Sequence, residues 1–123
     1  MISGRISASL EASIPLLVSG PDGQSLQVDA IVDTGFSGSL TLPLSVIESI
    51  GLTWLCRQQG MLADGRIHPF DVYTANIVWD NSERTIEVEA ADVDPLLGMS
   101  LLAGYRVTME VRASGNMTIE SLE

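Results

Sequence analysis

The chain has 123 residues, which is enough for one ordinary domain and too few for a second core. Hydrophobic residues make up 46% of the chain and charged residues 18%, which is a globular composition. Six Lys and Arg stand against 16 Asp and Glu, so the net charge is −10. A chain this acidic is a poor match for nucleic acid or for an anionic membrane surface, and we expect neither as a partner.

Cysteine and histidine usage narrows the chemistry further. Cys56 is the only cysteine, which excludes an intrachain disulfide and a cysteine-based metal site. His68 is the only histidine, which removes most zinc sites and Ser-His nucleophiles. No apolar run approaches the roughly 18–20 residues of a membrane span. Ser and Glu residues interrupt the opening stretch, so it lacks the continuous apolar core of a signal peptide. We therefore expect a cytoplasmic protein without metal or cofactor.

Apolar residues alternate with period two along most of the chain, which predicts strands. Pro15 lies inside the first such run and indicates an edge or a bend there. Clusters of Gly, Pro, Asp, Asn and Ser separate the runs and predict tight turns at 20–23, 63–65, 80–82 and 114–116. The predicted strands cover residues 6–18, 26–32, 54–73 as a hairpin, 70–79, 86–90, 105–112 and 117–121.

Only two segments have the pattern of helices. Residues 44–50 follow Pro43, place three apolar side chains on one face and stop at Gly51. A shorter helix is predicted over 100–103, ending at Gly104. The composition and pattern thus predict a single, all-β domain over residues 1–123, a small barrel or sandwich with one or two short helices.

The segment Val32-Asp33-Thr34-Gly35 carries the candidate chemistry. It ends an apolar strand, where a carboxylate is unfavourable unless it has a chemical role. Gly35 lets another backbone approach closely. Asp-Thr-Gly alone is weak, because a strand that ends in an Asx-type turn has the same sequence pattern. A second apolar segment closes with Asp94-Pro95-Leu96-Leu97-Gly98 ahead of a short helix, so the two halves share a weak internal repeat.

An apolar-Asp-Thr-Gly motif followed about sixty residues later by apolar-Leu-Gly before a short helix resembles the retropepsin-like (clan AA) aspartic proteases, especially their small bacterial single-domain members. The resemblance covers about residues 5–120. It includes the Phe36-Ser37-Gly38 continuation, the helix region at 42–51 and the turn Ala63-Asp64-Gly65. It implies a closed β-barrel of the acid-protease type, with a flap hairpin at about residues 54–73.

The resemblance also implies roles for individual residues. Asp33, Thr34 and Gly35 would form the catalytic loop, with Thr34 hydrogen-bonded to the loop of a partner chain and Gly35 in contact with the substrate backbone. The residues implied for substrate binding lie beside this loop, in the apolar-Leu-Gly segment that packs under it, and at the flap tip: Phe36, Ser37, Ala63, Asp64, Gly65, Leu96, Leu97 and Gly98.

Aspartic-protease chemistry needs two carboxylates that share one proton across a water molecule. The chain has one Asp-Thr-Gly and no room for a second lobe, so the second carboxylate must come from another copy across a twofold axis. We therefore expect a homodimeric aspartic endopeptidase that hydrolyses peptide bonds through a water held between the two Asp33 carboxylates.

Three positions depart from the viral members of the family. Phe36 stands where they have Ala, Met99-Ser100 stands where they have Arg-Asn or Arg-Asp, and the turn at 63–65 holds one glycine where their flaps are glycine-rich. The acidic surface, the missing arginine at 99–100 and the atypical flap turn favour an alternative hypothesis, a non-catalytic dimeric peptide-binding or scaffold module with the same fold. A third hypothesis is a single lobe that pairs with a different protein.

Overall fold

In a computed structural model that describes residues 1–62 and 64–123, the chain forms ten strands and two short helices. The mainly β prediction with one or two short helices is confirmed. The strands are β1 (Ile2–Ile6), β2 (Ala12–Ser19), β3 (Ser25–Val32), β4 (Leu40–Leu42), β5 (Thr53–Met61), β6 (Ile67–Trp79), β7 (Ser82–Ala90), β8 (Leu96–Leu97), β9 (Tyr105–Met109) and β10 (Asn116–Ser121). The helices are α1 (Leu44–Ile50) and α2 (Met99–Leu102).

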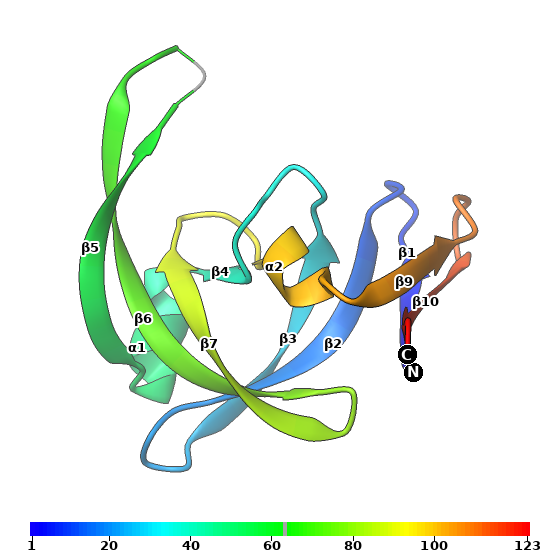
Figure 1. Cartoon of the computed structure of the whole chain (residues 1–123), viewed down its shortest axis with the longest axis horizontal. Helices are drawn as coiled ribbons and strands as arrows, with labels where there is room; N and C mark the ends of the chain where they lie inside the picture. Colours follow the sequence, from blue (N-terminus) through cyan, green and yellow to red (C-terminus); the bar gives the residue numbers. More distant parts are fainter. Residues whose placement is uncertain (63) are drawn as a thin grey trace.

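The described strands join one mixed sheet in the order β5-β6-β7-β4-β8-β3-β2-β1-β10-β9. β2 also pairs with β6 through Val18–Ile77 and Ser19–Asn76, so the six strands from β6 to β2 form a partial ring (Figure 1). Within this ring β3 runs parallel to β8, and β4 runs parallel to β7. The two-residue strand β8 therefore lies between β3 and β4 and joins the two halves of the ring.

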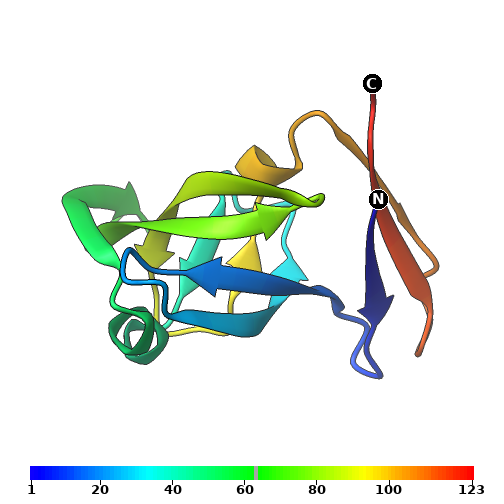
Figure 2. The ribbon, with the colours of Figure 1, turned by 90° about the horizontal axis from the view of Figure 1, so that it is seen from below.

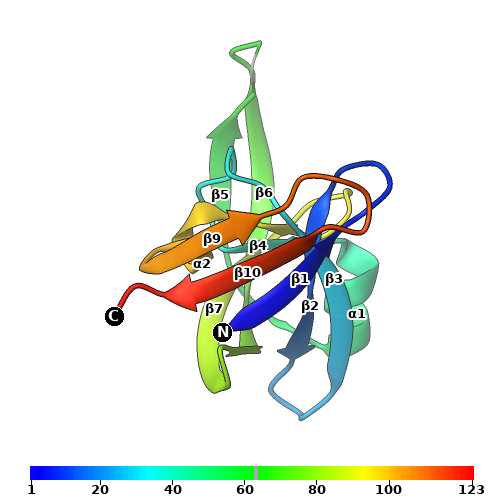
Figure 3. The same cartoon turned by 90° about the vertical axis from the view of Figure 1, so that its right-hand side faces the viewer.

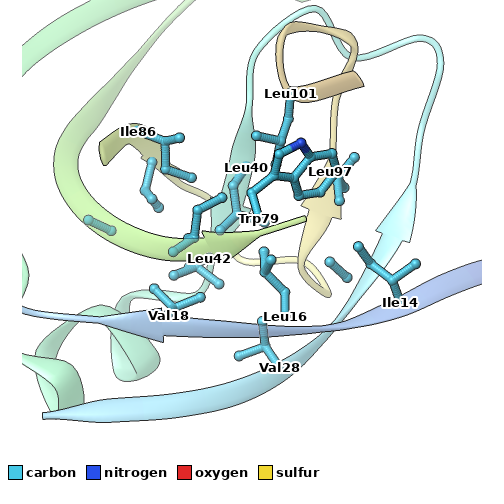
Figure 4. Packing of buried hydrophobic residues seen from close by; sticks show 14 of the residues in the cluster. Ile14, Leu16, Val18, Val28, Leu40, Leu42, Trp79, Ile86, Leu97 and Leu101 are labelled. Atoms are coloured by element: carbon cyan, nitrogen blue, oxygen red, sulfur yellow. The ribbon is translucent and has the colours of Figure 1, made fainter. Parts of the chain in front are cut away.

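The hydrophobic core fills the ring (Figure 4). Strand residues enter it alternately, because successive side chains of a strand point to opposite faces. On β7, for example, Ile86 and Val88 are buried while Glu87 is exposed. Leu101 of α2 is fully buried and closes one end of this cluster. Burying each such side chain contributes roughly 1.5–3 kcal/mol.

The local predictions for the two helices and for the turn at 80–82 hold within a residue. α1 has the predicted bounds, and Gly51 ends it at φ 72° while donating its N–H to the carbonyls of Ile47 and Glu48. α2 begins and ends one residue before the predicted 100–103. Asp80 and Asn81 both have positive φ, 50° and 65°, as a tight two-residue hairpin turn requires. No helix among the described residues has the length and apolarity to cross a membrane.

The prediction of one strand over 6–18 is wrong, because a turn divides that stretch into β1 and β2. The Ser7 N–H donates to the Glu11 carbonyl, and Leu10 has a φ of 64°. Pro15 lies in the part of β2 that has only β3 as a neighbour, since β1 and β6 pair with the two ends of β2. Its missing N–H therefore costs the sheet little, as the edge prediction requires.

The first and last strands pair with each other outside the ring. Figure 2 shows β1 and β10 set crosswise to β2 and β3, and Figure 3 shows β9, β10 and β1 side by side. β10 is the additional hairpin strand predicted over 117–121, and it covers an edge of β1. β9 ends at Met109, three residues before the predicted limit, and is the last strand of the sheet.

Candidate functional site

The loop of residues 33–39 joins β3 to β4 and holds the Asp-Thr-Gly motif. Its position follows from the parallel pairing of β3 with β8, in which Val32 lies opposite Leu97. The Asp33 N–H donates to the Leu97 carbonyl at 2.9 Å, and the Ile31 N–H donates to the Pro95 carbonyl at 2.8 Å. The internal repeat seen in the sequence thus becomes a direct pairing that fixes the backbone of Asp33.

Asp33 begins a tight turn that orients its own carboxylate. The Gly35 N–H donates to Asp33 Oδ1 at 2.9 Å, and the Phe36 N–H donates to the Asp33 carbonyl at 3.2 Å. A Cβ at Gly35 would lie only 3.2 Å from Asp33 Oδ1, so glycine suits this close approach. The other carboxylate oxygen, Oδ2, has no hydrogen-bond partner within residues 1–62 and 64–123. The half-buried carboxylate therefore has one fixed oxygen and one that is available to a water or a substrate.

The rest of the loop is held by the segment that leads from β8 into α2. Three backbone N–H groups and one hydroxyl of this segment donate to carbonyls of the loop. These bonds are Gly98 N–H to Ser39, Met99 N–H to Phe36, Ser100 N–H to Gly38, and Ser100 Oγ to Ser37 at 2.6 Å. The loop is thereby fixed along its whole length and not only at its ends.

Gly98 is required by the closeness of this packing. A Cβ there would overlap the Gly38 carbonyl oxygen and would lie 2.7 Å from the Phe36 carbonyl oxygen and 2.6 Å from the Phe36 ring. The ring of Phe36 also lies against Gly38, whose Cβ would be 2.6 Å from it. Phe36 thus packs within the loop, in a half-buried position, while Ser37 is exposed.

The two leucines before Gly98 support the loop from beneath. Leu97 has no exposed surface and belongs to the core, so its side chain does not line a cleft, in contrast to the expectation. Leu96 is half-buried, and its N–H donates to Thr41 Oγ1 at 2.9 Å. Thr41 is a buried polar residue of β4. Its hydrogen bond with Leu96 links β8 to β4, and β8 is also paired with β3.

The predicted hairpin over 54–73 is present and is formed by β5 and the first part of β6. It projects from the body of the molecule (Figure 1), and its last strand pair is Met61 with Ile67. Met61 and Ile67 are 76% and 63% exposed, so this end has no core of its own. Asp64 and Gly65 form the tip, where Asp64 accepts hydrogen bonds from the backbone and side chain of Arg66. The predicted contact residue Ala63 lies outside the described residues.

Two open grooves border opposite ends of the loop. The first, the hairpin groove, has a volume of about 480 Å³; strands β5, β6 and β7 line it together with Gly38, Ser39 and Ser100. The second, the apolar groove, has a volume of about 500 Å³ and is bordered by Thr34. Its other lining residues come from β3, α2 and β9: Val32, Met99, Leu102, Tyr105, Val107 and Met109.

Glu89 makes the hairpin groove acidic where it meets the loop. Burial and, to a smaller extent, the neighbouring charge of Glu87 raise the pKa of Glu89 above its usual value. A Cβ at Gly38 would lie 2.5 Å from Glu89 Oε2, so this carboxyl group stands directly beside the loop. Arg84 lines the same groove.

No known protein family matches the chain, and no curated protein matches it in sequence. Within the described residues, no group of three His, Cys, Asp or Glu side chains is placed to hold a metal ion. The arrangement offers an oriented carboxylate at a strand end, a rigid loop around it, and two grooves.

Three residues that secure or border the loop were missed from the sequence. Thr41 had a visible feature, a single polar residue between two leucines in an apolar strand. Ser100 stands two residues after the apolar-Leu-Gly pattern, at a helix start where a hydroxyl often bonds to backbone. No sequence feature marks Glu89, because in an alternating strand it is indistinguishable from the exposed Glu87.

Proposed function

We propose that this chain is a homodimeric aspartic endopeptidase with the acid-protease fold, in which Asp33 of each copy supplies one of two catalytic carboxylates. The partial ring of strands, taken as the barrel of that fold, and the hairpin beside it support this proposal. The observation that carries it is the geometry of Asp33. Its backbone is fixed by Leu97, one carboxylate oxygen is fixed by Gly35, and the other oxygen is available.

Two such carboxylates facing each other would share one proton, because two like charges at that distance do not both ionise. The ionised carboxylate would take a proton from the water held between them, while the protonated one would polarise the scissile carbonyl. The loop contributes by holding Asp33 in place before substrate arrives, so that little reorganisation is needed during the reaction.

The surroundings of the loop fit the remaining tasks. Thr34 is exposed, and its hydroxyl has no hydrogen-bond partner among the residues described, so it can bond to the loop of a partner chain. The hairpin groove would receive an extended peptide, with Gly38 and Ser39 on the loop side and Ser37 next to them in the chain. The β5–β6 hairpin would act as a flap, and its exposed pair Met61 and Ile67 would be covered by substrate on closure.

A non-catalytic dimeric peptide-binding module is the second candidate function. It is favoured by the position of the hairpin groove, which reaches Gly38 and Ser39 but not Asp33. In such a module a peptide would occupy this groove, and no bond would be cleaved.

The decisive experiment compares wild type with Asp33→Asn on a peptide library and an unfolded protein substrate. Asparagine keeps an oxygen for the Gly35 N–H but cannot exchange the shared proton, so cleavage should fall by on the order of 10³-fold or more while the melting temperature changes little. Asp29→Asn, an exposed change on the same strand, is the matched control and should retain activity.

Three outcomes decide between the candidates. Cleavage that is blocked by a statine-type hydroxyl analogue, with a bell-shaped pH profile, supports the protease. Peptide binding without products supports the module. Turnover that persists in Asp33→Asn refutes the assignment of Asp33.

A further inference from the structure

β9 is an edge strand whose outer side is unpaired in the part of the chain that the structure describes. It ends the sheet and pairs only with β10 (Figure 3). The Glu110 N–H donates to the Asn116 carbonyl, and the Leu122 N–H donates to the Gly104 carbonyl. The hydrogen-bonded pairs of this antiparallel ladder therefore fall on the even-numbered residues of β9.

The odd-numbered residues of β9 consequently direct their backbone groups outward. Tyr105, Val107 and Met109 present unpaired N–H and C=O groups along one edge, and the same three residues line the apolar groove. Soluble proteins usually protect such an edge with Pro, charged side chains, a bulge or a covering segment. Within the described residues, β9 has no Pro, bulge or covering segment and one charged side chain, Arg106, while Met109 and Val111 are 37% and 67% exposed at and just beyond it.

We propose that β9 pairs antiparallel with β9 of a second copy, across a twofold axis that passes beside Thr108. The choice of a second copy as the partner rests on the proposed function, which needs a partner next to the loop. The apolar groove, which Thr34 borders, would then face the axis. The sheet would continue from one copy into the other as β1-β10-β9 followed by the same strands in reverse order.

Charge favours this register over the neighbouring one that equally suits the outward backbone groups. A twofold axis beside Val107 would place Arg106 opposite the partner's Thr108, without a charged partner. An axis beside Thr108 places Arg106 opposite the partner's Glu110, and by symmetry this contact forms twice. Among the described residues, the Glu110 carboxylate has an exposed contact of 3.7 Å with Arg112 and accepts a bond of 3.3 Å from the Asn116 N–H, and it has no other polar partner there. Neither contact buries the carboxylate, which remains exposed.

Cysteine cross-linking tests this register directly. In a Cys56→Ser background, the Cα atoms of two Thr108→Cys residues would be about 4.5 Å apart in a pair without hydrogen bonds, within disulfide range. Two Arg106→Cys residues would be about 13 Å apart and out of range. We expect a covalent dimer from Thr108→Cys on oxidation and none from the Arg106→Cys control. Equal cross-linking of both variants, or cross-linking of neither, would overturn the proposal.

A charge exchange tests the same contact without a covalent bond. Arg106→Glu should weaken dimerisation at least tenfold in sedimentation, and adding Glu110→Arg should restore it. Arg5→Glu makes the same charge change on β1 and should leave association unchanged. Dimerisation that is insensitive to Arg106→Glu overturns this interface even if peptides are cleaved. Conversely, if the variants change dimerisation as expected but the protein cleaves no peptide, the proposed protease activity is refuted and the proposed interface is supported.

Discussion

The loop of residues 33–39 and the tip of the β5–β6 hairpin are supported in opposite ways. The loop is fixed by Leu97 at its start and by four hydrogen bonds from the segment 98–100 along its length. Among the described residues, the bonds at the tip are local, such as those from the Leu62 N–H to the Arg66 carbonyl and from the Gly65 N–H to the Leu62 carbonyl. Every described residue from Met61 to Pro69 is exposed.

This difference suits the loop to accurate positioning and the hairpin tip to motion. A carboxylate that acts on a water must be held within a fraction of an ångström, which requires a loop bonded to the core. A cover that admits a peptide must open at low free energy, which few contacts and an exposed backbone allow. The following substitutions test whether the loop and the tip really differ in this way.

Gly98→Ala should have the largest effect, because its Cβ would overlap the Gly38 carbonyl and no rotamer can relieve a backbone contact. We expect the free energy of unfolding to fall by about 3 kcal/mol or more, measured by urea denaturation. Gly60→Ala in the hairpin is the matched control, because its Cβ meets only the Phe70 ring at 3.2 Å, and we expect less than about 1 kcal/mol. Similar losses for the two variants would contradict the comparison.

Ser100→Ala should lower the free energy of unfolding by about 1 kcal/mol, because it removes the 2.6 Å hydrogen bond to the Ser37 carbonyl. It should also lower peptide cleavage, since Ser37 belongs to the loop that carries Asp33. Ser49→Ala is the control, as it removes a similar 2.8 Å bond to the Val46 carbonyl in α1. If both variants keep full activity, the bond to Ser37 does not position the loop.

Gly65→Ala tests the hairpin tip, where the φ of 84° disfavours a Cβ. Gly23→Ala in the β2–β3 turn, with a φ of 80°, is the control and should cost about 1 kcal/mol of unfolding free energy. Gly65→Ala should cost less, because the tip can open without disturbing the core, yet it alone should change the KM for peptides. Equal losses of stability would show that the tip is as tightly coupled to the fold as the β2–β3 turn.

Glu89→Gln should have the smallest effect, and its sign should depend on pH. Burial raises the pKa of Glu89, so the folded protein holds this proton more tightly than the unfolded chain. The stabilising effect of the protonated form is complete below the usual pKa of 4.5 and is lost as the pH rises through the raised pKa. Glu89→Gln should therefore melt at a higher temperature than wild type near pH 7, with the difference shrinking toward pH 4. A difference that is constant over this range would contradict the expectation.

The elements that depend on local sequence were predictable, and those that depend on distant pairing were not. Gly51 and the Asp80-Asn81 turn have conformations that few other residues adopt, so α1 and the β6–β7 hairpin could be placed. The division between β1 and β2 was missed, because alternation continues through the turn that the Ser7 N–H bond to the Glu11 carbonyl closes.

The site was predictable to the same degree. The packing of the Leu96-Leu97-Gly98 segment under the Asp33 loop was an expectation from the family resemblance, and β3 does pair with β8. The burial of Leu97 could not be predicted, because exposure within an apolar pair depends on which face the neighbouring strands cover. The bond from Ser100 to the Ser37 carbonyl could not be predicted either, since it joins positions 63 residues apart.

The two-residue strand β8 has a consequence for when the loop of Asp33 becomes fixed during folding. Leu97, which anchors Asp33, follows it by 64 residues, so a partly folded molecule leaves the acid on an unanchored loop. Under the proposed function, the site would become competent only once β8 has paired with β3.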